Sequence, residues 1–390
     1  MKDTPHSPQS VFSSSYGEAR EKFINEANNA GADIKSFEHP SIQCPGSSQV
    51  IADALPTNTL NTDALTIDTA WIGSRDAKSV LVMICGTHGP ESYTGAALQL
   101  DWLRRYDSMP STTTAMLLIH AANPFGWAYC SRTTENNVDL NRNFIDHQQK
   151  PPQTALTQQV QDLLSSSNAK GPRFKKILFG LFKLIIKFGP VKLLNEISQG
   201  QYSHPNGIGF GGHSAEWSNQ TLRSIFHNQL NGAERVAIID WHTGIGDYGK
   251  PRFLCFDKPD TDEYKRARHM WGAALDDSDA NYSSGERPDY QGLLINALSD
   301  IARGAGAKTT SCVIEFGTYS NLKMLKALLI DRWLRFSASD AKPETKAALK
   351  TKMLSLFYPD DPGWRASVLD HGNDIISQSL VGLYEQEVKQ

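Results

Sequence analysis

This chain of 390 residues is poor in several features that mark particular classes of protein. Its five cysteines are an odd number without a C-x-x-C pair, which argues against a disulfide framework and fits a reducing compartment. No uninterrupted apolar run reaches about 18 residues, and the polar start MKDTPHSPQS lacks the apolar segment of a secretory signal, so we expect neither a spanning helix nor export. A net charge of −3 gives no general attraction to nucleic acid. These absences make the cytoplasm the expected location.

Several catalytic motifs are also missing. The chain has no G-x-S-x-G, H-E-x-x-H or P-loop pattern, and the first absence weakens a serine hydrolase interpretation. The pattern G-x-G-x-x-G occurs twice, at residues 207–212 and 244–249. A dinucleotide site needs a strand before these glycines and a helix after them. Because the first copy follows a polar loop and the second precedes the strand-like KPRFLCF, we expect no dinucleotide at either place.

Short apolar runs of the kind that form buried strands are present. Parallel strands covered on both faces are continuously apolar, and such runs occur at residues 79–85, 115–121, 236–241 and 311–316. Between the first two, residues 92–106 repeat apolar side chains at helical spacing, which indicates a strand–helix–strand unit. We therefore predict an α/β protein with a mainly parallel sheet and helices on both faces.

The length of the chain exceeds the roughly 250–300 residues at which single cores usually stop growing. We therefore expect one main domain with a sizeable insertion, or one domain with a small accessory part. Residues 1–15 are polar and rich in Ser and Pro, so we predict a loose N-terminal segment. The strand–helix pattern then predicts a single domain over residues 16–390, interrupted by an insertion at residues 147–232.

Inside this insertion, residues 173–194 read RFKKILFGLFKLIIKFGPVKLL, which is basic, very apolar and free of acidic residues. At helical spacing, Lys176, Lys183 and Lys187 fall on one face. The segment either packs on the protein with its lysines reaching outward, or makes a weak contact with an anionic membrane surface. The packed arrangement is favoured, because amphipathic helices commonly face a core.

The segment LVMICGTHGPES at residues 81–92 places His88 and Glu91 three positions apart, directly after an apolar run. At this spacing one turn can present both side chains to a metal ion, although the H-x-x-E pattern alone is common. His242 follows the strand-like IIDW and is the best third ligand, whereas taken alone it fits a structural histidine. Because ligands bind at the carboxyl ends of parallel strands, we expect these residues to meet at one edge of the sheet.

Glu315 lies in VIEFGT, at the end of another apolar run. A buried carboxylate is costly unless it has a partner or a task, so it is either salt-bridged to an arginine or a general base that deprotonates water. Its place at the end of a strand favours the base. Asp240 could accept the second ring N–H of His242, although neighbouring strand positions point to opposite faces.

Two further segments supply polar groups. VDLNRNF at residues 138–144 contains Asn141 and Arg142, and an arginine fork can hold a carboxylate with two hydrogen bonds. Arg132 lies in CSRTTENN, from which it could polarise a carbonyl and stabilise an oxyanion. Because arginines are common on protein surfaces, the role of Arg132 stays open at this point.

These motifs resemble those of the zinc carboxypeptidase superfamily, the carboxypeptidase A-like metallopeptidases with their succinylglutamate desuccinylase and aspartoacylase relatives. The H-G-x-E form of the first motif is nearer to the acylases. Over most of residues 15–380, the segments GQYSHPNGIGFGG, WSNQTLR, DWHTGIGDYG and EFGTYS are more closely similar to a bacterial branch known only as a domain of unknown function. The resemblance implies a mixed, mainly parallel twisted α/β sheet of about eight strands.

The resemblance also implies roles for single residues. His88, Glu91 and His242 match the ligands of one zinc ion, and Glu315 matches the general base. The resemblance thus completes the metal site that strand ends and residue types suggest.

For the substrate, the resemblance implies that Asn141 and Arg142 hold a free carboxylate and that Arg132 polarises the scissile carbonyl. Carboxypeptidases also carry a mobile tyrosine ahead of the general base, and no single residue aligns with it here. The candidates are Tyr248, Tyr290 and Tyr319.

The predicted function is that of a zinc-dependent hydrolase cleaving an amide bond next to a free carboxylate. It would be either a metallocarboxypeptidase acting on peptides or a deacylase acting on N-acyl amino acids. The alternative is a non-catalytic peripheral membrane or peptide-binding protein on the same fold, suggested by residues 173–194. The intact set of ligands and base argues against this alternative, because an enzyme that has lost turnover usually loses one of them.

Overall fold

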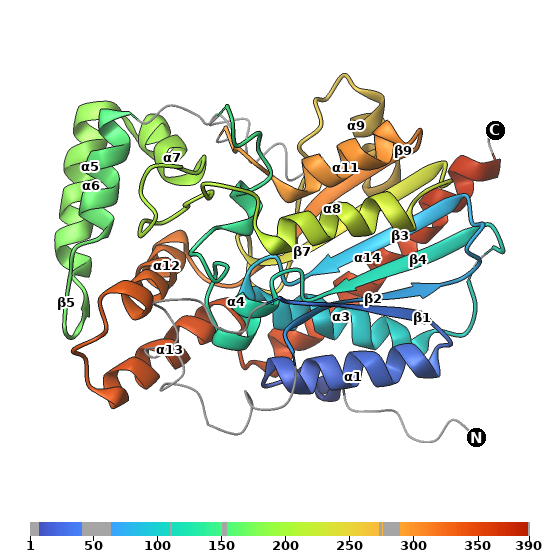
Figure 1. Ribbon diagram of the computed structural model, residues 1–390, viewed down its shortest axis with the longest axis horizontal. Coiled ribbons are helices and arrows are strands. Elements are labelled where there is room, and N and C mark those ends of the chain that lie inside the picture. Colours follow the sequence, from blue (N-terminus) through green and yellow to red (C-terminus); the bar gives the residue numbers. More distant parts are fainter. Residues whose placement is uncertain are drawn as a thin grey trace.

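The computed structural model describes residues 8–40, 64–109, 111–149, 154–272, 275 and 289–388. At its centre lies a seven-stranded sheet in the order β1-β2-β4-β3-β7-β9-β8 (Figure 1). Its strands are β1 (Asp33–Glu38), β2 (Thr66–Ile72), β3 (Ser79–Cys85), β4 (Thr114–His120), β7 (Arg235–Gly244), β8 (Pro251–Leu254) and β9 (Lys308–Gly317). The four central strands β4, β3, β7 and β9 are parallel, and β1, β2 and β8 pair antiparallel at the edges. The predicted mixed sheet with a parallel centre is confirmed, with seven strands among the described residues instead of about eight.

Helices cover both faces of this sheet, as predicted. One face is covered by α1 (Tyr16–Asn29), α3 (Ser92–Arg105) and α14 (Pro362–Val388), and the other by α8 (Trp217–Gln229) and α11 (Leu294–Gly304) (Figure 1). Helix α3 connects the parallel strands β3 and β4. The predicted strand–helix–strand unit is therefore confirmed.

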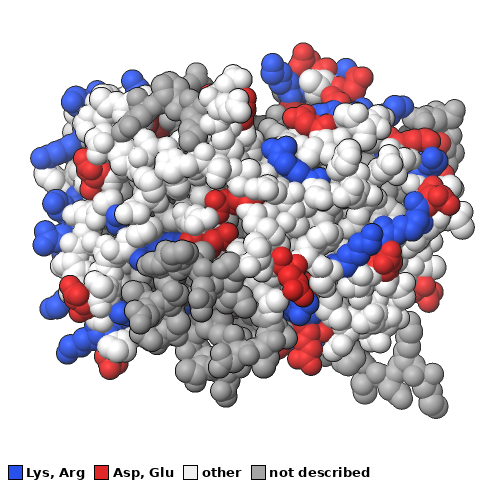
Figure 2. All heavy atoms as spheres, in the orientation of Figure 1, with Lys and Arg blue, Asp and Glu red and all other residues white. Residues whose placement is uncertain are grey.

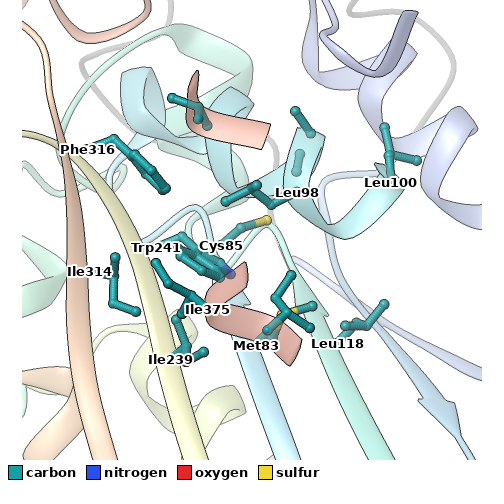
Figure 3. Packing of buried hydrophobic residues seen from close by; sticks show 14 of the residues in the cluster. Met83, Cys85, Leu98, Leu100, Leu118, Ile239, Trp241, Ile314, Phe316 and Ile375 are labelled. Atoms are coloured by element: carbon teal, nitrogen blue, oxygen red, sulfur yellow. The ribbon is translucent and has the colours of Figure 1, made fainter. Parts of the chain in front are cut away.

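The side chains of β3 alternate between the two helical layers. Leu81 and Met83 belong to the core beneath α1, α3 and α14, whereas Val80 and Val82 belong to the core beneath α8 and α11. This alternation follows from the two-residue period of a strand. Figure 3 shows the first core, where strand side chains pack against α3 and α14; its labelled residues include Met83, Leu118, Trp241, Ile314, Phe316, Leu98 and Ile375. Packing on both faces fixes the strands and their ends.

Shorter helices and two small strands complete the described chain. They are η1 (Pro8–Val11), η2 (Gly89–Glu91), α4 (Pro124–Tyr129), η3 (Leu140–Arg142), α5 (Ala155–Leu164), β5 (Ser167–Asn168), β6 (Gly171–Pro172), α6 (Phe174–Phe188), α7 (Pro190–Ser198), α9 (Asp262–Trp271), α12 (Asn321–Phe336) and α13 (Pro343–Phe357). Gly189, with φ +85°, and Pro190 separate α6 from α7. Helices α5, α6, α7 and α12 share an apolar cluster of their own beside the sheet (Figure 1). No helix among the described residues is long and apolar enough to cross a membrane.

The sequence predicts a loose N-terminal segment over residues 1–15. Residues 1–7 lie outside the described chain, and the residues that follow include two buried apolar side chains. Val11 and Phe12 are 2 % and 7 % exposed in the first core, and the ring of Phe12 lies 6.2 Å from that of Tyr358. Burial of these two apolar side chains outweighs the polar composition of the segment.

Candidate metal centre

His88 and Glu91 lie just after β3, where the chain passes close to the end of β4. Gly86 has φ +87°, and a Cβ there would lie 3.0 Å from Ala121 Cα, so the turn requires glycine. Helix η2 follows, with His88 at its N-cap and Glu91 at its end. Both side chains are only 3 % exposed, which makes this turn part of the interior.

His242 and Glu315 come from the neighbouring parallel strands β7 and β9. They face each other directly in the register of the two strands, so their side chains lie on the same side of the sheet. His242 is 2 % exposed and Glu315 is 8 % exposed. Because β7 also pairs with β3, the residues predicted to meet lie at the carboxyl ends of three adjacent strands.

Glu91 lies between the two histidines. His88 Nδ1 is 3.1 Å from Glu91 Oε1, and His242 Nδ1 is 3.0 Å from Glu91 Oε2. One ligand atom from each of these side chains lies within 4.8 Å of the others. His88, Glu91 and His242, here called the His–Glu–His group, could therefore hold one metal ion.

Each histidine of the group contacts a second carboxylate. His88 Nε2 lies 3.0 Å from Asp139 Oδ1, and His242 Nε2 lies 2.8 Å from Asp240 Oδ2. A neutral imidazole that donates from Nε2 carries a lone pair on Nδ1. Both Nδ1 atoms are directed at Glu91, so when a cation displaces the protons from these nitrogens, two lone pairs and a carboxylate converge on it. This donor set, oriented from behind by carboxylates, fits a divalent cation.

Of the two carboxylates that contact the histidines, only Asp240 was considered from the sequence. Asp240 lies two positions before His242, so the two side chains share a face of β7, and the objection that neighbouring positions point to opposite faces does not apply. Asp139 was missed, although it lies within VDLNRNF. It also caps η3 by accepting a hydrogen bond from the backbone N–H of Asn141 at 3.0 Å. The signal that could have identified Asp139 is the carboxylate that a metal-binding histidine usually needs behind it.

Arg132 reaches the group from the loop that follows α4. Its Nη1 lies 2.7 Å from Glu91 Oε1 and 2.9 Å from His88 Nδ1. Its Nη2 lies 3.3 Å from Asp139 Oδ2, and its backbone N–H donates to Asp331 at 3.2 Å. The loop and the carboxylates therefore hold a fixed positive charge beside the His–Glu–His group, where negative charge developing on a ligand oxygen would be stabilised.

Burial and charge shift the pKa values of these groups in different directions. Burial raises the pKa of Glu91, but the positive charges around it, that of His88 first, outweigh burial and hold the pKa below its usual range. Burial lowers the pKa of His242, but Asp240 and then Glu91 raise it well above the usual value. For Glu315 burial dominates, and it raises the pKa to about 7. A carboxylate with a pKa near neutrality can both accept and release a proton.

Asn141 and Arg142 lie on η3 and contact other segments. Asn141 Oδ1 accepts a hydrogen bond from the backbone N–H of Leu294 at 2.9 Å. Arg142 Nε donates to the carbonyl of Ser198 at 3.0 Å, and its guanidinium carbon lies 4.9 Å from the ring centroid of Tyr290. In the described part of the chain, neither side chain hydrogen-bonds to the His–Glu–His group. The pair is linked to the group only indirectly. The backbone N–H of Asn141 donates to Asp139, and Asp139 contacts His88.

The three candidate tyrosines lie in two places. Tyr248 and Tyr319 follow β7 and β9, with ring centroids 5.7 Å apart, and Tyr248 is 45 % exposed. Tyr290 lies beside Arg142 instead. Tyr248 and Tyr319 thus stand beyond the strand ends, whereas Tyr290 contacts the other polar cluster.

The structure thus combines a mixed α/β sheet with a buried His–Glu–His group, able to hold a metal ion, at the carboxyl ends of its central parallel strands. The chain belongs to the family described as "Protein of unknown function (DUF2817)", whose model matches residues 12–371. The resemblance to a branch of unknown function is therefore confirmed.

Solved structures also match the chain. A carboxypeptidase A from Helicoverpa armigera is 15 % identical over 89 % of this chain and 77 % of its own, with a TM-score of 0.45. Bovine thrombin-activatable fibrinolysis inhibitor, solved with a tick carboxypeptidase inhibitor, is 11 % identical over 90 % of this chain and 98 % of its own, with a TM-score of 0.46. A comparison with curated proteins finds no match in sequence. With TM-scores below 0.5, neither likeness says what this chain does.

Proposed function

We propose that this protein is a zinc-dependent hydrolase that cleaves an amide bond next to a free carboxylate. The observation that carries the proposal is the convergence of His88, Glu91 and His242, with a second carboxylate behind each histidine. Two imidazoles and one carboxylate are a known ligand set of catalytic zinc, in which a fourth position stays open. The substrate is either a peptide C-terminus or an N-acyl amino acid.

The residues around the group divide the chemistry of amide hydrolysis among them. Bound zinc would polarise the scissile carbonyl and lower the pKa of water. Glu315, on β9, takes a proton from the attacking water and delivers it to the leaving amine. Arg132, held by Glu91, stabilises the oxyanion that develops on the carbonyl. Asp139 and Asp240 keep the two imidazole rings in one orientation and tautomer.

Arg142 is the residue proposed to hold the free carboxylate of the substrate. Its Nε donates to the carbonyl of Ser198 and its Nη1 to the carbonyl of Asn141, so the guanidinium is fixed in place. Among the described residues its Nη2 has no hydrogen-bond partner, and this nitrogen would donate to a carboxylate. Asn141 ties the same turn to α11 through Leu294.

We expect Arg142→Ala to raise KM for substrates with a free carboxylate by roughly 10–100-fold, while kcat changes less. The reason is that lost charge-assisted hydrogen bonds contribute about 1.5–3 kcal/mol to binding. Steady-state kinetics on matched free and amidated substrates measure this effect. Arg104→Ala, which removes an ion pair with Glu26 on the far helices, is the control. Equal losses on free and amidated substrates would contradict the assigned role.

Activity is expected to fall on the acid side of neutrality. The pKa of Glu315 is raised to about 7 by burial, and a general base works only in its deprotonated form. A bound cation favours the charged carboxylate, so we expect a midpoint at or below about 7, with kcat/KM falling about tenfold per pH unit beneath it. A pH profile at saturating zinc tests this expectation. A rise in kcat/KM toward acid pH would mean that the working form of Glu315 is protonated.

A substrate screen tests the proposed function as a whole. Zinc-loaded protein is incubated with peptides bearing free C-termini and with N-acyl amino acids. Peptides shortened one residue at a time identify a carboxypeptidase, and a free acid released from N-acyl amino acids identifies a deacylase. Failure to turn over either class, with zinc bound, would overturn the proposal.

A further inference from the structure

Helix α6 has apolar side chains on two opposite faces. On one face, Ile177 and Leu181 are buried in the cluster shared with α5 and α12. On the other, Phe179, Phe182 and Ile186 are 60 %, 58 % and 71 % exposed. Their spacings of three and four residues place them on one stripe of the helix. Packing on the protein therefore accounts for only part of the apolar surface of α6, and exposed apolar patches bordered by polar groups are typical of interaction sites.

Cationic side chains border the exposed stripe. Lys176, Lys183 and Lys187 are exposed, and the ammonium of Lys183 lies 4.5 Å from the ring centroid of Phe179. Residues 170–195 contain seven cationic side chains and no acidic one, within a chain whose net charge is −3. Figure 2 shows Lys and Arg side chains along the left edge of the molecule, where Figure 1 places α5 and α6. The positive charge is thus concentrated around the apolar stripe.

Helix α7 extends this surface. Val191 and Leu194 are 43 % and 53 % exposed, while Leu193 between them is buried. Lys192 lies with its ammonium 5.8 Å from the ring centroid of Phe188, at the end of α6. Both helices therefore combine a buried apolar side with exposed apolar and cationic groups.

We propose that α6 and α7 dock on an anionic lipid surface, with the stripe of Phe179, Phe182 and Ile186 between headgroups and the lysines beside lipid phosphates and carboxylates. An amphipathic helix that lies in a membrane interface combines apolar residues with cations in this way. The charge favours lipid over a second copy of this chain, because a symmetric pair would place like-charged lysines against each other. The surface shares no residue with the His–Glu–His group, so docking and hydrolysis are separable.

The test is co-sedimentation of the full chain with vesicles. Vesicles of phosphatidylcholine mixed with phosphatidylserine are compared with vesicles of phosphatidylcholine alone. The protein is expected to bind the first and to be released as salt is raised, because surface charge is screened. Two variants, Phe179→Ser/Phe182→Ser/Ile186→Ser and Lys176→Gln/Lys183→Gln/Lys187→Gln, should each lower the bound fraction by at least about tenfold.

Matched controls separate docking from general effects of charge and folding. Lys35→Gln/Lys265→Gln/Lys308→Gln removes three exposed lysines from other elements, and Val381→Ser removes an apolar side chain that is 56 % exposed on α14. Both should bind lipid like the unchanged chain, and circular dichroism should show all variants folded. Three results would overturn the proposal: no sedimentation with anionic vesicles, equal binding to phosphatidylcholine alone, or binding that neither the apolar nor the lysine triple variant lowers. The proposal would also be overturned if the protein formed an oligomer in solution that Phe179→Ser/Phe182→Ser/Ile186→Ser dissociated, because the stripe would then serve self-association.

Discussion

Glu315→Gln is expected to keep the metal and to lower kcat by about 10²–10⁴-fold, the range that a positioned general base contributes. The substitution preserves the shape of a side chain that is 8 % exposed, but an amide cannot accept a proton from water or pass one to an amine. The residue lies opposite His242 in the β7–β9 register and is not a member of the metal-holding group, so zinc should stay. Turnover and zinc content are measured on the same preparation.

The matched control for this prediction is Glu196→Gln. Glu196 is also buried, at 7 % exposure, but it accepts a hydrogen bond from Thr157 in the cluster beside the sheet. Its substitution should leave kcat within a fewfold of the unchanged protein, even if some stability is lost. Full activity in Glu315→Gln would eliminate Glu315 as the base, and another group near β9 would then have to take the proton.

His242→Ala should lose both metal and turnover. It removes one of the two imidazoles that converge on Glu91 and leaves Asp240 without its histidine partner. A catalytic metal contributes several kcal/mol to the transition state, so we expect kcat/KM to fall by at least about 10³-fold. Equilibrium dialysis against zinc should show about one ion per unchanged chain and close to none in the variant.

His204→Ala is the control for the loss of metal. His204 lies outside the His–Glu–His group and hydrogen-bonds to Ser203 and Gln158. The His204→Ala variant should bind as much zinc as the unchanged protein does. If His242→Ala bound as much zinc as the unchanged protein, the metal would have to bind at another site. The proposed chemistry would then lose its basis.

Much of the fold was predictable because its strands carry a local pattern. Residues 79–85 were predicted as a strand and form β3 over the same span, since a parallel strand buried on both faces is apolar throughout. Ligands bind at the carboxyl ends of parallel strands, and this rule predicted that His88, His242 and Glu315 lie at one edge of the sheet. The N-terminal residues were less predictable, because Val11 and Phe12 join a core built from distant segments, and the ring of Phe12 lies beside that of Tyr358.

The contacts around the site were harder to predict. Asp139 meets His88 across 51 positions of chain, and nothing in the local spacing of VDLNRNF distinguishes it from its polar neighbours. The position of Arg142 beneath Tyr290 likewise depends on two segments that meet only in the folded protein. The sequence shows that α6 is apolar on two faces. Only the structure shows that one face is buried in the cluster with α5 and α12 and that the other is exposed.

Zinc-edge anomalous diffraction from crystals soaked in zinc tests the central claim most directly. The predicted result is one strong peak about 2.0–2.2 Å from His88 Nδ1, His242 Nδ1 and a carboxylate oxygen of Glu91. The Nε2 atoms of both histidines should remain hydrogen-bonded to Asp139 and Asp240. A peak bound to other residues, or no peak at the His–Glu–His group in fully soaked crystals, would contradict the account.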